Sequence, residues 1–434
     1  MSMPTPRTVS WLFLAVSVWG AWFTYNGFRP RYRGGRLAVV SFFAGWLTTE
    51  LALHHVAWQA AFTVGFVWLG ALSAWPGWVG LGITLVSWAG LLRCFLGARD
   101  AERVVERALR EGLGADYEQR IAPDVSAHFA PGVQWSQLLV PMPVRHPEVE
   151  RIPDIVYAEH GGVKLRLDVY RRRERPVGCP TLLQIHGGGW VLGSKNEQGL
   201  PLMMHLASRG WVCATANYRL APRATFPDPL IDLKAAIRWL REHGPEYGAD
   251  PDFLVVTGGS AGGHLCALVA LTANDPAYQP GFEHVDTHVD GCVSFYGVYD
   301  FVDEARNWPH GGLRDLLETQ VMKSSPHTDR SAWERASPIY RVHEHAPPFL
   351  VIHGDKDTMV PVAEARRFAQ ALREHTPGPV VYAEIPGAQH AFEIFPSLRT
   401  TFVLHGVERF LAHLYSQHRA SRRPAAIAVG GGRQ

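Results

Sequence analysis

Hydrophobic and polar residues follow two different patterns along this chain of 434 residues, and the pattern changes near residue 99. Before that point apolar runs dominate, and neither 9–28 nor 56–92 contains an Asp, Glu, Lys or Arg. After residue 150, short runs of β-branched residues alternate with helical patterns. This alternation is typical of a mostly parallel sheet with helices on both faces, that is, of an α/β fold.

The first 98 residues have the composition of membrane helices. Residues 9–28 suffice to cross a hydrocarbon layer of about 30 Å, and no cleavage pattern follows them. Residues 37–53 form a second candidate that contains Glu50, and 56–92 is long enough for two spans, broken near 73–77. We therefore expect a transmembrane helical region of about four spans in 1–98. The alternative is a buried helical cap domain.

Arginines on either side of these segments give conflicting signals about orientation. One group, which predicts a cytoplasmic first loop, consists of Arg29, Arg31, Arg33 and Arg36. Four spans then place the following domain outside the cytoplasm, but a second group favours the cytoplasm for that domain: Arg93, Arg99, Arg103, Arg107 and Arg110. The two signals agree only if one apolar segment does not cross. Because large domains translocate regardless of flanking charge, we expect a multi-pass protein whose large domain is extracytoplasmic.

Three segments flank or interrupt the α/β pattern. Residues 99–113 alternate charged and apolar positions as an amphipathic helix does, with Glu106 and Arg110 spaced for an ion pair. Residues 114–150 are irregular and include an apolar patch at 135–144, which is either a linker packed on the domain or part of a cap. Residues 299–345 interrupt the domain 151–415 as a lid, and we expect the tail 416–434 to be disordered.

The domain is organised around a strand-like run that leads into Gly258-Gly259-Ser260-Ala261-Gly262. A helical pattern follows at once, so the serine lies on a sharp turn between strand and helix. Such a turn lifts the hydroxyl above the edge of the sheet, where it can act as a nucleophile.

An earlier strand, 181–185, ends in His186-Gly187-Gly188-Gly189, where adjacent glycines leave backbone N–H groups uncovered. In an acyl-transfer enzyme such a loop, with the N–H of Ala261, binds the oxyanion of the tetrahedral intermediate.

An acid and a base follow later strands. Strand 349–353 leads to Asp355 and Asp357, and strand 380–385 leads to His390. Serine needs an imidazole to take its proton, and a carboxylate orients that imidazole. The order Ser260, Asp357, His390 is that of α/β-hydrolases. Asp355 competes with Asp357, and either carboxylate could instead cap the helix that begins near Val362.

Composition excludes several other functions. The five cysteines form no C-x-x-C pair and the histidines are dispersed, so we expect no disulfide framework, no metal site and no cofactor. A net charge of +2 gives no sign of a nucleic-acid partner. The sequence carries no signal of oligomeric state.

In combination, these motifs resemble the hormone-sensitive-lipase-like branch of the α/β-hydrolases, over about 151–415. The runs that carry the resemblance are 186–190, 218–222, 258–263, 353–361 and 387–392. The resemblance implies Asp357 as the acid and Gly188, Gly189 and Ala261 as oxyanion donors, with Gly187 shaping the loop. The family often has Asp where this chain has Gly259. The arrangement is also similar to membrane-anchored esterases of the arylacetamide deacetylase type and to actinobacterial membrane-associated esterases.

The favoured hypothesis is a membrane-anchored serine esterase or lipase whose partners are lipophilic esters and the bilayer. An amidase or formamidase with the same triad is the second hypothesis. The third is a catalytically silent hydrolase fold that acts as a membrane-tethered binding protein, which a complete triad argues against.

Overall fold

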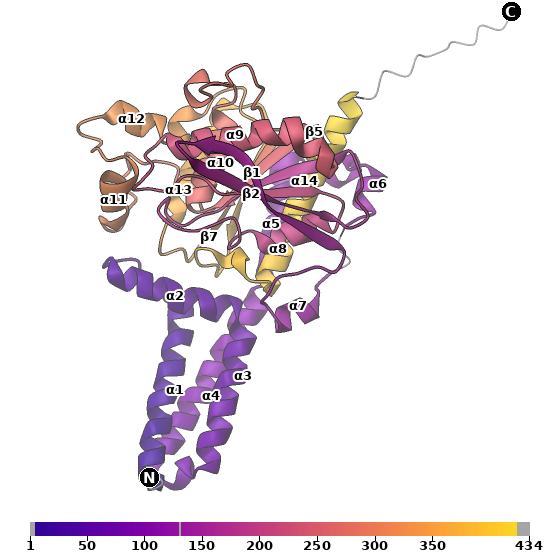
Figure 1. Cartoon of the computed structure of the whole chain (residues 1–434). Helices are drawn as coiled ribbons and strands as arrows, with labels where there is room; N and C mark the ends of the chain where they lie inside the picture. Colours follow the sequence, from indigo (N-terminus) through magenta and orange to yellow (C-terminus); the bar gives the residue numbers. More distant parts are fainter. Residues whose placement is uncertain (1–4, 130–131, 423–434) are drawn as a thin grey trace, which may run out of the picture.

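The computed structural model describes residues 5–129 and 132–422, which form a helical N-terminal region and an α/β domain seated on one end of it (Figure 1). The α/β domain is built on an eight-stranded sheet of order β1-β2-β4-β3-β5-β6-β7-β8. Strands β1 and β2 are antiparallel to their neighbours, and the strands from β4 to β8 are parallel to one another. The expected fold is confirmed. The strands are β1 (Val149–His160), β2 (Val163–Arg172), β3 (Cys179–Ile185), β4 (Val212–Ala216), β5 (Ala249–Gly259), β6 (Gly291–Phe295), β7 (Phe349–Gly354) and β8 (Val380–Ile385).

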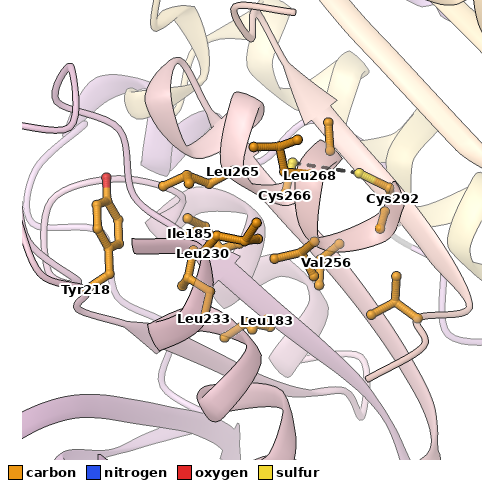
Figure 2. Packing of buried hydrophobic residues seen from close by; sticks show 14 of the residues in the cluster. Leu183, Ile185, Tyr218, Leu230, Leu233, Val256, Leu265, Cys266, Leu268 and Cys292 are labelled. Atoms are coloured by element: carbon orange, nitrogen blue, oxygen red, sulfur yellow. Dashed lines mark hydrogen bonds between the residues drawn. The ribbon is translucent and has the colours of Figure 1, made fainter. Parts of the chain in front are cut away.

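Alternate side chains of the central strands fill two separate cores, because successive residues of a strand point to opposite faces. Leu183 and Val256 pack with Leu265 on the face covered by α9 (Asp228–His243), α10 (Ala261–Leu271) and α13 (Val362–His375), as Figure 2 shows for part of that core. Leu182 and Val255 belong to the opposite core, under α8 (Leu200–Ala207) and α14 (Leu398–Arg422). Because the strands from β4 to β8 run in the same direction, their carboxyl ends meet at one edge of the sheet.

The amphipathic helix expected after the membrane region is present as α5 (Asp100–Leu113) and belongs to the α/β domain. Its apolar face packs on β8 and α14, in the same core as Leu182. Arg110 Nε donates to Glu106 Oε1 at 2.6 Å, as the spacing predicts. Contact with α14 is close, since a Cβ built on Gly406 would lie 2.0 Å from Cγ1 of Val105.

In the N-terminal region, α1 (Pro6–Phe28), α3 (Ala52–Trp68) and α4 (Trp75–Gly97) lie side by side (Figure 1). Small polar side chains join them, as where Thr24 Oγ1 and Ser87 Oγ lie 2.7 Å apart. Ser10 Oγ donates to the carbonyl of Ala71 at 2.6 Å, which ties the start of α1 to the turn between α3 and α4. That turn therefore lies at the end of the bundle far from the α/β domain (Figure 1).

Helix α2 (Arg36–Glu50) is different, because it lies across the end of the bundle, beneath the α/β domain (Figure 1). It meets α3 at an angle of 92°. Two helical stretches, Pro6–Phe28 and Trp75–Leu113, are long and apolar enough to cross a membrane, or up to three if α2 and α3 together count as one span. These candidates are fewer than the four spans expected from the sequence. The physical reason is that α2 has only 15 residues, about 22 Å of helix, and packs one face on the α/β domain.

Two further expectations concern the segments at the periphery. Residues 299–345 include the short helices α11 (Gly312–Leu316) and α12 (Arg330–Arg335), and this segment is anchored by the fully buried Trp333. The expectation of a disordered tail is wrong for residues 416–422, because α14 continues to Arg422. Residues 423–434 lie outside the described residues.

The contact between α5 and α14 can be tested by Gly406→Ala. In a helix without this contact, replacing Gly by Ala stabilises by about 1 kcal/mol. Here the added methyl overlaps Val105, so we expect a lower melting temperature in thermal unfolding of the purified full-length chain. Val105→Ala opens the space, and the double variant should therefore lose less than the two single variants together. Additive losses would contradict the contact.

Candidate active site

The turn after β5 holds Ser260 in a backbone conformation that few residues adopt, with φ 60° and ψ −121°. Its neighbours permit this turn because they lack side chains. A Cβ on Gly262 would lie 2.1 Å from the carbonyl oxygen of Ile185, and one on Gly263 would lie 2.5 Å from that of Phe295. Strand, turn and α10 are thus packed backbone to backbone, which fixes the hydroxyl of Ser260 at the carboxyl edge of the sheet.

The structure brings Ser260, His390 and Asp357 together in one chain of hydrogen bonds. Ser260 Oγ lies 2.9 Å from His390 Nε2, and His390 Nδ1 lies 2.6 Å from Asp357 Oδ2. With Nδ1–H donating to the carboxylate, Nε2 is free to accept the serine proton. This arrangement is suited to activating a hydroxyl for nucleophilic attack.

Asp357 is held as an ionised acceptor. Its Oδ1 accepts from the backbone N–H groups of Met359 and Val360, each at 2.8 Å, and its Oδ2 lies 3.1 Å from His353 Nε2. Burial alone would raise the pKa of Asp357, but the imidazoles of His390 and His353 hold it well below its ordinary value. Asp355 instead accepts from the N–H of Gly387 at 2.7 Å, so it braces the loop and does not pair with His390.

Gln389 cross-links the two loops, a role that the sequence analysis missed. Its Oε1 accepts from the N–H of Thr358 at 2.7 Å and from the N–H of His390 at 2.9 Å. One buried side-chain amide therefore joins Thr358, the residue after the acid, to His390, the base. A glutamine before a histidine carries no recognisable signal in one sequence.

The glycine loop after β3 lies against the turn of Ser260. A Cβ on Gly187 would lie 2.7 Å from the carbonyl oxygen of Gly259, and the N–H of Gly187 donates to Gln198 Oε1 at 2.6 Å. Gly188 and Gly189 both have positive φ, at 112° and 60°. Within 5–129 and 132–422, neither of their N–H groups donates a recorded hydrogen bond. Such N–H groups, with that of Ala261 at the start of α10, can stabilise an oxyanion.

The space beside Gly259 is taken by Tyr296. A Cβ on Gly259 would lie 2.5 Å from the Tyr296 hydroxyl, which donates to the buried Glu393. The Tyr296 ring also packs on His390, with ring centroids 4.5 Å apart. Burial raises the pKa of Glu393 to about 7. The turn of Ser260 thus has a neighbouring carboxylate, that of Glu393, which follows β8.

Two segments outside the sheet reach the catalytic groups. Phe42 of α2 lies edge-on to the imidazole of His390, with ring centroids 6.0 Å apart. Leu316, in the segment expected to be a lid, would be 3.4 Å from a Cβ on Gly189. Apolar side chains therefore lie on both the base side and the oxyanion side. Within the described ranges no group of three or more His, Cys, Asp or Glu side chains could hold a metal ion.

Comparison with known proteins places this geometry in a family. A family model described as BD-FAE matches residues 167–372. The chain is 40% identical over 420 residues to the probable carboxylic ester hydrolase LipM of Mycobacterium tuberculosis, covering 94% of each chain. It is 37% identical over 393 residues to the esterase LipQ of the same organism, covering 90% of this chain and 88% of LipQ.

The chain belongs to the family of the mycobacterial Lip esterases. It is a carboxylic ester hydrolase of the α/β-hydrolase fold. A solved structure titled as a truncated carbohydrate esterase from gut microbiota has the same fold, with 24% identity, a TM-score of 0.53 and coverage of 62% of this chain and 96% of that one. Because the match to LipM covers 94% of this chain, it extends beyond the α/β domain into the N-terminal region.

The distinct places of the two aspartates predict different effects in this esterase. Asp357→Asn removes the ionised acceptor of His390 and should lower kcat by several orders of magnitude, because the imidazole loses its orienting partner. Asp355→Asn keeps an oxygen for the N–H of Gly387 and should change kcat by less than about tenfold, the equivalent of 1.4 kcal/mol. The measurement is hydrolysis of a p-nitrophenyl ester by folded protein. A larger loss in Asp355→Asn would contradict the assignment.

Glu393 predicts a pH-dependent stability. Its pKa of about 7 is raised above the ordinary value, so its contribution to stability is complete at low pH and is lost as pH rises through about 7. Glu393→Gln has no such titration, and its melting temperature relative to the unsubstituted esterase should therefore increase between pH 5 and pH 8. The exposed Glu344→Gln serves as control. A difference that stays constant with pH would refute the titration.

Proposed function

We propose that this esterase is anchored in a membrane and hydrolyses lipophilic carboxylic esters through an acyl-enzyme on Ser260. The observation that carries the proposal is the hydrogen-bonded chain from Asp357 through His390 to Ser260, beside the N–H groups of the glycine loop. It lies over helices apolar and long enough to cross a bilayer.

In the acylation half, the Ser260 oxygen attacks the ester carbonyl and His390 Nε2 takes its proton. The resulting oxyanion accepts hydrogen bonds from the N–H groups of Gly188, Gly189 and Ala261. The tetrahedral intermediate then collapses, the bond to the alcohol oxygen breaks, and His390 returns the proton to that oxygen. Asp357 stabilises the imidazolium while it exists.

In the deacylation half, water replaces the alcohol. His390 takes a proton from water, whose oxygen attacks the acyl carbonyl. The resulting oxyanion accepts hydrogen bonds from the same N–H groups as before. The bond to Ser260 breaks, the serine oxygen regains a proton, and the carboxylic acid leaves. The same residues could cleave an amide, but every activity named for the similar proteins above is that of an esterase.

The substrate class is inferred from the surroundings of the site. Phe42, beside His390, and Leu316, beside Gly189, offer apolar surface next to the catalytic groups. A substrate dissolved in the bilayer would be concentrated close to a catalytic domain that is seated directly on the membrane helices (Figure 1). Lipophilic esters of short to medium chain length are therefore the proposed substrates.

The arrangement of the helices also supports a different orientation from the one expected above. If α1, α3 and α4 cross and α2 does not, both arginine groups lie on the side of the catalytic domain. The loop after α1 carries Arg29, Arg31 and Arg33, and the second group begins with Arg93 near the end of α4 and continues beyond that helix. Among the described residues, the far end of the bundle carries a single Lys or Arg, which is Arg7. The positive-inside rule then favours a cytoplasmic catalytic domain.

Substrate preference can be tested with a series of p-nitrophenyl esters and one matched anilide. Each methylene buried in an apolar pocket contributes about 0.8 kcal/mol, so kcat/KM should rise about fourfold per added carbon until the pocket is full. Ser260→Ala should abolish the activity. Preference for acetate over all longer esters would contradict a lipophilic substrate, and faster hydrolysis of the anilide would identify an amidase.

Orientation can be tested by labelling introduced cysteines with a membrane-impermeant maleimide in intact spheroplasts. The five native cysteines are buried and give a low background. Glu344→Cys lies on the catalytic domain and should be labelled only after lysis, whereas Ser73→Cys at the far end of the bundle should be labelled from outside. The reverse pattern would overturn the cytoplasmic assignment. Release of the full-length chain from membranes by alkaline carbonate would overturn the anchoring itself.

A further inference from the structure

Helix α2 contacts the loop of the acid and the loop of the base, although it precedes both by more than 300 residues. Thr358, which follows Asp357, donates its Oγ1–H to the carbonyl of Ala38 at 3.3 Å. Trp46 Nε1 donates to the carbonyl of Ala391, which follows His390, at 2.9 Å. A backbone carbonyl and an indole N–H of α2 thus contact the residues immediately after the two catalytic side chains.

The contact at Ala391 falls where the backbone needs support. Ala391 has φ 59°, in the left-handed region that a residue with a Cβ rarely adopts. Such a conformation persists only when its surroundings hold it in place. The indole of Trp46 holds the carbonyl of this residue, and the ring of Phe42 lies against the imidazole before it.

A buried ion pair fixes the carboxyl end of α2. Glu50 pairs with Arg399 at the start of α14, and both side chains are at most 2% exposed. Glu50 Oε2 also accepts from Ser397 Oγ at 2.7 Å. Arg399 Nε donates in turn to the carbonyl of Pro386 at 3.3 Å, where the loop of His390 begins. The helix is therefore attached at both ends of that loop.

The opposite face of α2 is apolar and, within the part of the chain that the structure describes, makes no such contacts. Leu37, Val40 and Phe43 are each half exposed. At 100° per residue they share one side of the helix, away from Ala38, Phe42 and Trp46. A helix that lies across the end of a membrane bundle with an apolar outer face suits the bilayer interface.

We propose that α2 is a positioning element of the active site, and that Trp46 is its principal positioning residue, acting through Ala391 on His390. The N-terminal region then does more than anchor the esterase, because the geometry between His390 and Ser260 depends on it even for esters dissolved in water. This inference rests on the triad proposed above.

The test uses Trp46→Phe in the full-length chain, which removes the N–H donor and keeps an aromatic ring against Phe42 and Phe395. Its matched control is Trp58→Phe on α3, whose recorded ring contacts, to His55 and Phe62, lie within that helix. The substrate is a soluble p-nitrophenyl ester. Rates are expressed per active site, counted by complete reaction with a fluorophosphonate, so that unfolded protein does not contribute.

We expect Trp46→Phe to lower kcat by about tenfold while KM changes by less than about twofold, since displacements near 1 Å cost up to about a hundredfold. The acid limb of the kcat/KM profile should move to lower pH, because a misplaced imidazole pairs less well with Asp357 and its cation is less stable. Trp58→Phe should leave both unchanged. Phe42→Leu, which removes the ring edge from His390, is the second variant if Trp46→Phe yields no folded protein.

The two proposals fail in different ways. If Trp46→Phe and Phe42→Leu match the unsubstituted esterase in kcat per site and in pH profile, α2 is only structural, even if the melting temperature falls. If Ser260→Ala, measured in parallel, keeps its activity, the triad itself is wrong. Loss in Ser260→Ala with no loss in the α2 variants overturns the present inference alone.

Discussion

The hydrogen bonds from Asp357 to His390 and from His390 to Ser260 are the interactions on which the rest of the site depends. Each residue lies on a different loop, after β7, β8 and β5, and each bond is useful only within a few tenths of an ångström. The sheet brings the loops to one edge but cannot fix their tips. Glycines pack the turn of Ser260 against its neighbours, and Gln389 ties the acid loop to the base.

Helix α2 of the N-terminal region contributes to the site as well as to the membrane anchor. A membrane anchor alone requires only apolar helices, yet α2 carries a tryptophan donor, an aromatic edge and a buried carboxylate directed at the catalytic domain. A buried ion pair such as Glu50–Arg399 is weak evidence for stability, because both charges lose water. Its value here is geometric, since it fixes where α2 ends relative to the loop of His390.

The fold was predictable because each strand and helix has a local pattern, and so were the places of Ser260, Asp357 and His390 in the sequence. The packing of α2 on the catalytic domain was not predictable. Residues 37–53 are as apolar as a membrane span, and Glu50 appeared in the sequence only as a charged residue within that candidate span. Its partner Arg399 is 349 residues away, and no local pattern reveals such a pair.

Related limits explain the other differences. Gln389 acts through its side-chain oxygen on two backbone N–H groups, a role that residue type alone does not indicate. The Gly259 position looked like a departure from the family, but Tyr296, which follows β6, fills that space and donates to Glu393, which follows β8. The orientation could not be derived from the arginines alone, because it depends on the number of spans. Whether α2, a short apolar helix lying across the bundle, counts as a span changes that number.

The central claim is that hydrolysis proceeds through an ester on Ser260. It can be tested by mixing the full-length esterase with a p-nitrophenyl ester, quenching with acid during the first turnover and mapping the peptides by mass spectrometry. The account predicts an acyl adduct on the peptide that contains Ser260, which forms at a much reduced rate in His390→Ala. An adduct on another residue, or turnover without any adduct under conditions where a burst of p-nitrophenol is released, would contradict it.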